Sequence, residues 1–103
     1  MGNPSHSHST AADGDSITGM QIRMARAALR WRATKLADMT ELGWAWIQQL
    51  ERHDDVPSAP VDVLGRVRKV FEDAGIRFVP GDSDTHGSVR VSRSRPAHEG
   101  EEA

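Results

Sequence analysis

The sequence predicts a mostly α-helical fold: four helices, then a short pair of β-strands, with disordered ends. Three observations support this fold class. Apolar residues recur at helical spacing from about residue 18 to residue 75, and alternation replaces that spacing between residues 76 and 92. Both ends are rich in small, polar and charged residues and show no hydrophobic period. A chain of 103 residues also suits one small domain.

These patterns divide the chain into four parts. We expect a disordered segment over 1–16, a helical domain over 17–75, a strand segment over 76–92 and a disordered acidic tail over 93–103. Apolar residues make up 37% of the chain and aromatic residues only 5%, which agrees with a single core that leaves out the two ends.

The first helix is expected to begin after Thr18, because threonine is a favoured N-cap residue. Ile22, Ala25 and Leu29 follow at helical spacing, and the pattern continues to Trp31. The arginines of this segment fall outside the apolar face. The helix is therefore predicted to be amphipathic.

A second, short helix is predicted over residues 33–39, with Leu36 and Ala37 buried. The segment 40–43 then turns the chain, and Gly43 is a plausible N-cap for the next helix.

The third helix is expected over residues 44–52 and has two unlike faces. At about 100° per residue, Ile47 and Leu50 form a narrow apolar face. The opposite side carries glutamines and an arginine, where a helix used only for packing more often has Lys, Glu or Ala. This side consists of Ala45, Gln48, Gln49 and Arg52. We therefore expect it to bind a partner.

A loop is predicted over residues 53–60, which are rich in Asp and Pro. The fourth helix follows from about Val61, and Gly75 supplies its stop. Its broad apolar face consists of Val63, Leu64, Val67, Val70, Phe71 and Ala74.

Two strands are predicted after Gly75, over 76–79 and 89–91, with a turn region at 80–82. A lone two-stranded hairpin is marginal in water, so it must pack on the helices or pair with a second copy. Pairing with a second copy suggests a homodimer. The residues expected to form that interface are Phe78, Val79, Val89 and Val91.

Basic residues gather in the helical region, although the net charge of the chain is −2. Between residues 17 and 53, six basic residues stand against three acidic ones. The basic residues are Arg23, Arg26, Arg30, Arg32, Lys35 and Arg52. Such a stripe favours contact with phosphates, whereas the acidic tail is typical of a solubilising end.

The absence of cysteine excludes disulfides and thiolate metal sites, and it fits a reducing compartment. No apolar run approaches the roughly 20 residues that cross a bilayer. The N-terminus lacks the pattern of a signal peptide. We expect a soluble, cytoplasmic protein without membrane contact.

Few residues are candidates for catalysis or metal binding. His6 and His8 could hold a metal ion loosely, but two histidines in a disordered segment are more often solvated bystanders. His53, Asp54 and Asp55 form a loop charge cluster that is more typical of a solvated surface. The sequence contains neither a Gly-rich phosphate loop nor a nucleophile motif. We expect no enzyme activity, no cofactor and no metal.

A helix, a short helix, a tight turn and an outward-facing third helix follow the helix-turn-helix order. From Thr18 to about Val79 the chain resembles the XRE, lambda-repressor-like family of regulators, especially small bacterial members with a short C-terminal strand segment. The resemblance rests on Gln21-Ile22-Arg23-x-Ala25-Arg26-x-x-Leu29-x-Trp31, Leu36-Ala37, Leu42, Ile47-Gln48-Gln49-Leu50-Glu51, Val56-Pro57 and Phe71-Glu72-x-Ala74-Gly75-Ile76-x-Phe78. It implies a four-helix, lambda-repressor-like domain and a dimeric regulator, a repressor or autoregulator, that binds specific double-stranded DNA.

The resemblance also implies roles for individual residues. Arg26 would pair with Glu51 and fix the first helix to the third; a competing interpretation makes Arg26 a phosphate contact. The start of the third helix would enter the major groove, where Gln can bind adenine and Arg guanine. The residues expected to face bases are Trp44, Ala45, Gln48 and Gln49. Those expected to contact the DNA backbone are Arg32, Thr34, Lys35 and Arg52.

Three departures from the family pattern open a second hypothesis. Arg32 and Ala33 stand where the family often has Ser or Thr followed by Gln, Glu41 replaces the usual turn glycine, and tryptophans occupy positions 44 and 46. Tryptophan is a preferred anchor in protein interfaces. The alternative is therefore a helix-turn-helix domain that binds a protein, as an antiactivator or antitoxin-like partner, through Trp44. Trp46 would either join that contact or pack against the fourth helix.

Overall fold

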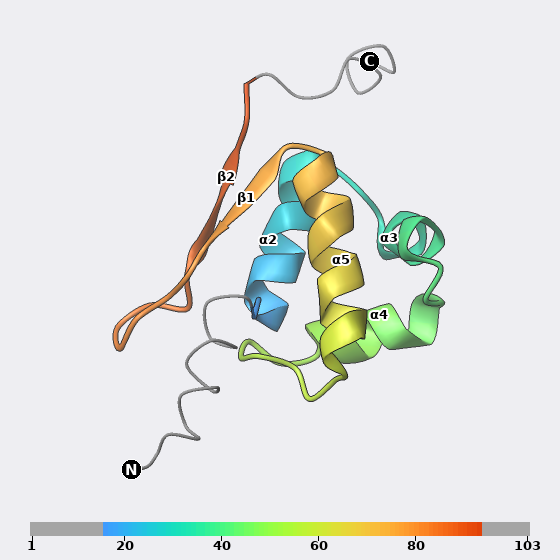
Figure 1. Ribbon diagram of the computed structural model, residues 1–103, viewed down its shortest axis with the longest axis horizontal. Helices are drawn as coiled ribbons and strands as arrows, with labels where there is room; N and C mark the ends of the chain where they lie inside the picture. Colours follow the sequence, from blue (N-terminus) through green and yellow to red (C-terminus); the bar gives the residue numbers. More distant parts are fainter. Residues whose placement is uncertain (1–15, 94–103) are drawn as a thin grey trace.

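The structure, a computed structural model, describes residues 16–93 (Figure 1). Within this range four helices precede a two-stranded antiparallel sheet, which confirms the predicted order and the mostly helical class. The elements are α2 (Gly19–Leu29), α3 (Ala33–Thr40), α4 (Trp44–Glu51), α5 (Val61–Asp73), β1 (Ile76–Val79) and β2 (Ser88–Val91). Apart from Ser16 and Arg93, the two ends that we expect to be disordered lie outside the described residues.

Helix α2 begins where the sequence predicts and ends earlier. Thr18 is its N-cap and forms a capping box with Gln21: the Gln21 amide donates to Thr18 Oγ1 at 3.0 Å, and the Thr18 amide donates to Gln21 Oε1 at 3.1 Å. The helix stops at Leu29 because Arg30 adopts a left-handed conformation with φ of 61°. The prediction that the helix continues to Trp31 is therefore wrong.

The turn between α3 and α4 has the strained backbone that its sequence suggests. Helix α3 runs one residue beyond the prediction, and Glu41 then takes a φ of 61°, where glycine is favoured. Gly43 follows with φ of 89° as the N-cap of α4. Helix α4 ends at Glu51, one residue before the predicted end.

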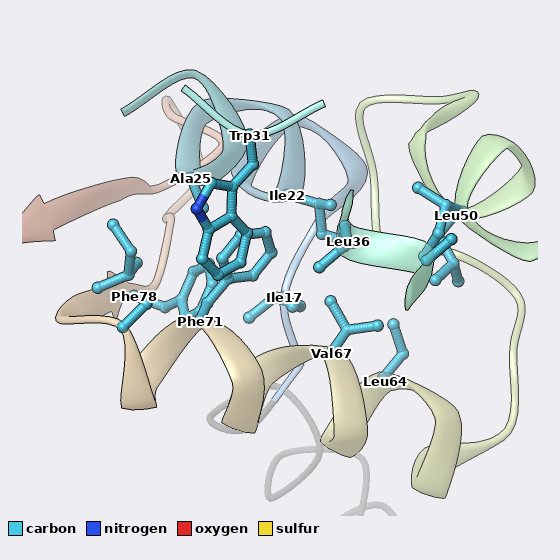
Figure 2. Close-up of a cluster of buried hydrophobic side chains, with 14 residues drawn as sticks. Ile17, Ile22, Ala25, Trp31, Leu36, Leu50, Leu64, Val67, Phe71 and Phe78 are labelled. Atoms are coloured by element: carbon cyan, nitrogen blue, oxygen red, sulfur yellow. The ribbon is translucent and has the colours of Figure 1, made fainter. Parts of the chain in front are cut away.

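The core lies between the helices and the inner face of the hairpin (Figure 2). Phe71 of α5 is fully buried at its centre. Its ring stacks on Trp31 at a centroid distance of 5.5 Å and meets Phe78 edge-on at 5.9 Å. The three aromatic rings join the α2–α3 connection, α5 and β1 into one packed unit. None of the described helices has the length and apolar composition needed to cross a membrane.

The hairpin packs on the helices of its own chain. Strands β1 and β2 pair antiparallel, with Phe78 opposite Val89, and they lie along α2 and α5 (Figure 1). Phe78 is only 7% exposed, because it fills the core beside Phe71. This burial leaves little of the Phe78 side chain for the predicted dimer interface. Val79 and Val89 are half-buried, whereas Val91 is 46% exposed.

Candidate nucleic-acid interface

Helix α4 separates its side chains as the sequence predicts. Ile47 and Leu50 are almost completely buried in the core. The other side is open to solvent. The exposed residues there are Ala45, Gln48, Gln49 and, directly after the helix, Arg52, with Trp44 at 52% exposure beside them. We call these five residues the exposed face of α4.

A bidentate ion pair holds α4 against α2. Arg26 donates from Nε to Glu51 Oε2 at 2.7 Å and from Nη2 to Glu51 Oε1 at 2.8 Å. Its Nη1 also donates to the Trp31 carbonyl at 3.0 Å. The hydrogen bond to Glu51 is the main reason that the pKa of Arg26 lies above its usual value. Arg26 thus bridges α2 and α4, which is the structural pair that the family resemblance implies.

Arg23 makes a second connection to α4, which the sequence analysis did not identify. Its Nη1 donates to the Glu51 carbonyl at 2.6 Å, at the end of α4 where carbonyls lack helical partners, and its other nitrogen pairs with Asp54. The spacing Arg23-x-x-Arg26 was the available signal, because residues three apart share a helix face. Two of the six basic residues are thus engaged within the fold. A Cβ on Gly19 would collide with the His53 carbonyl, so glycine is needed where α2 meets the end of α4.

The basic residues that remain near α4 are exposed. Arg32 and Lys35 lie at the start of α3, together with the exposed Thr34. The Lys35 ammonium lies 5.3 Å from the centre of the Trp31 ring. No side chain caps the amino end of α3, so its first amides stay open to an anion. Asp38 and Glu41 are also exposed, and they reduce the positive charge at the other end of α3.

The two tryptophans of α4 differ in burial. Trp46 is half-buried and packs against the core, as the structural interpretation of its sequence position predicts. Trp44 is left as the exposed aromatic residue of α4, and Met39, 44% exposed, is another large apolar side chain at the surface of this region. An apolar contact at this end of α4 would therefore depend on Trp44.

The charged loop after α4 has a structural explanation. Asp54 pairs with Arg23, and the carbonyls of Asp54 and Asp55 accept hydrogen bonds from the first amides of α2. Within residues 16–93, no three His, Asp or Glu side chains are placed to hold a metal ion. His6 and His8 lie outside the described range.

The chain was compared with protein-family models, with curated proteins and with solved structures, and none of the three comparisons gave a match.

Proposed function

We propose that this chain is a cytoplasmic transcriptional regulator, a repressor or autoregulator of the lambda-repressor-like XRE type, that reads a specific DNA sequence with α4. One observation carries the proposal. Helix α4 is fixed on one side by Ile47, Leu50 and the Arg26–Glu51 pair, and it presents glutamines and an arginine on the other. Side chains that read bases must be held by a rigid support, and this arrangement supplies one.

In the proposed complex the start of α4 lies in the major groove. Ala45, Gln48 and Gln49 face base edges, and each glutamine amide can bond bidentately to adenine. Trp44 borders this contact and can reach thymine methyl groups or sugars. The backbone contacts come from Arg32, Thr34, Lys35 and Arg52, together with the open amides of α3.

A test of the proposal begins with selection from a random duplex pool at two salt concentrations. Specific binding that weakens as salt rises is the expected result. Gln49→Ala should then lower the preference for the selected sequence, by about 1–3 kcal/mol if it removes one bidentate base contact. Selection of no sequence, even at low salt, would remove the DNA proposal.

A matched pair of arginine variants distinguishes a specific contact with the DNA backbone from the effect of overall protein charge. Arg52→Ala and Arg77→Ala remove the same charge from exposed positions, the first beside α4 and the second on the hairpin. Arg52→Ala should reduce the magnitude of the slope of the logarithm of the binding constant against the logarithm of the salt concentration, by the amount that corresponds to about one phosphate contact. Arg77→Ala should leave this slope unchanged. Equal effects would show that the binding is non-specific attraction.

Trp44 supports a second candidate function, binding of a protein partner. It is 52% exposed, and tryptophan often anchors protein interfaces. In this case Trp44→Ala would abolish binding to an identified partner, and Gln49→Ala would have little effect. Sequence-selective DNA binding that survives Trp44→Ala would favour the first function.

A further inference from the structure

Strand β2 has an edge that no other strand within residues 16–93 covers. The Ser92 amide donates to the Gly75 carbonyl at 2.8 Å on the β1 side. Bonded positions alternate along an antiparallel strand, so the backbone groups of Val89 and Val91 point away from β1. Val91 is also 46% exposed. This edge can accept a further strand.

Helix α2 presents a face without charge beside this edge. Arg23 and Arg26 lie on the side of the helix that meets α4. By helical spacing the other side is apolar and borders Gln21, whose bond to the Ser88 carbonyl fixes β2 next to it. Its members are Met20, Met24 and Ala28, of which the alanine is exposed. Helix α2 and β2 are in contact and run in the same direction (Figure 1).

We infer that the edge of β2 and the apolar face of α2 form an interface with a second copy of this chain. The two β2 strands pair antiparallel, and the hairpins become one four-stranded sheet. Side chains alternate along β2, with Val89 on the helix side, opposite Phe78, and Arg90 on the outer side. An added β2 therefore turns valines toward the apolar face of α2 and keeps its arginine in solvent. The interface is separate from the exposed face of α4 and does not depend on DNA binding.

Charge favours one of the three registers whose two-fold axis passes through Val89, Arg90 or Val91. A two-fold axis through Arg90 would extend the Arg77–Arg90 pair of the hairpin into a row of four arginines across the joined sheet, which is destabilising. An axis through Val91 would set Val89 opposite the partner's Arg93, so that a charge would face the apolar surface. The remaining register has its axis through Val89.

The register centred on Val89 has complementary charges at both ends. It pairs Arg90 with the partner's Ser88, and it brings Arg93 beside the partner's turn at residues 82–85. That turn carries two exposed aspartates, one of which accepts the hydrogen bonds that close it. By symmetry the contact occurs twice, so each basic strand end lies against an acidic turn.

Introduced cysteines test both the dimer and its register, because the chain has no cysteine of its own. Arg90 and the partner's Ser88 would form a non-hydrogen-bonded pair about 4.5 Å apart at Cα, within disulfide range. A mixture of R90C and S88C chains should therefore form a disulfide-linked heterodimer on mild oxidation, and neither variant should link efficiently to itself. Self-linking of R90C instead would overturn the register.

Sedimentation tests the interface without cross-linking. The full chain should show concentration-dependent dimerisation. Ala28→Glu, which places a carboxylate on the apolar face of α2, should raise the dissociation constant at least about tenfold. Ala45→Glu is the matched control, an exposed alanine on α4, and should leave dimerisation unchanged. A monomer at every concentration, or equal effects of the two variants, would overturn the proposal.

Discussion

Helix α2 holds two regions of the molecule by different chemistry. On one side Arg26 and Arg23 hold α4 with charged, partly exposed hydrogen bonds. On the other, the neutral and buried Gln21 holds the hairpin: its Nε2 donates to the carbonyls of Val79 at 2.7 Å and Ser88 at 3.0 Å. The α4 connection fixes a helix that we propose to be functional, whereas the Gln21 connection completes the core. Loss of either connection should destabilise mainly the region that this connection holds.

The largest effect is expected from Arg26→Ala, which leaves the Glu51 carboxylate, only 10% exposed, without its partner. The free energy of unfolding should fall by about 3 kcal/mol, because an unpaired, nearly buried charge remains. Urea denaturation measures the loss. The double variant Arg26→Ala/Glu51→Ala should lose less than the sum of the two single variants. A loss below about 1 kcal/mol for Arg26→Ala would show that the pair does not hold α4.

The next effect is expected from Gln21→Glu, a change with almost no difference in shape. A carboxylate can still accept from Thr18 but cannot donate to the two hairpin carbonyls, so stability should fall by about 2 kcal/mol. Amide exchange should become faster in β1 and β2, with a smaller change in α4. An equal increase of the exchange rate throughout the chain would contradict the view that Gln21 holds mainly the hairpin. The loss should lessen in acid, where the protonated side chain regains a donor.

A gain is expected from Glu41→Gly. Glu41 has a φ of 61°, and removal of its Cβ should relieve about 1 kcal/mol of strain in the turn before α4. Arg30→Gly is the matched control, since Arg30 has the same φ at the end of α2. Both variants should melt at a higher temperature. Only Glu41→Gly should also bind DNA more tightly, because it removes a negative charge next to the proposed interface.

The smallest effect concerns the hairpin turn. The pKa of Asp82 is lowered, mainly because its carboxylate accepts a hydrogen bond from the Asp84 amide and further bonds from Thr85. The turn is therefore stabilised above the ordinary pKa near 3.8, and this contribution is lost as pH falls through the lowered pKa. An NMR titration of the carboxyl carbon should show the low pKa in the wild type. Thr85→Val, which removes one donor, should move it upward, and an unchanged value would contradict this origin.

The same two regions show how far sequence reasoning reaches. The order of elements, the burial of Ile47 and Leu50, and the Arg26–Glu51 pair could all be predicted, because they follow from helical spacing or from a family pattern. The role of Gln21 could not. Its capping box with Thr18 is local and readable, but its bonds to Val79 and Ser88 depend on how the hairpin packs, about 60 residues further along the chain.

The burial of Phe78 within its own chain could not be predicted for the same reason. Alternation along 76–79 shows which residues share a face, and it does not show what covers that face. The ring of Phe71 covers Phe78 within one chain, so the proposal of a second copy rests on the edge of β2, which no other strand within residues 16–93 covers.

One measurement tests the central claim, that the exposed face of α4 reads DNA, most directly. Ala45→Glu sets a carboxylate in the middle of that face, where it would meet base edges and phosphates, while circular dichroism and thermal melting check that the fold is intact. Fluorescence anisotropy with the selected duplex should show affinity reduced at least about tenfold by this repulsion. A folded Ala45→Glu variant that binds the same duplex with unchanged affinity would contradict the account.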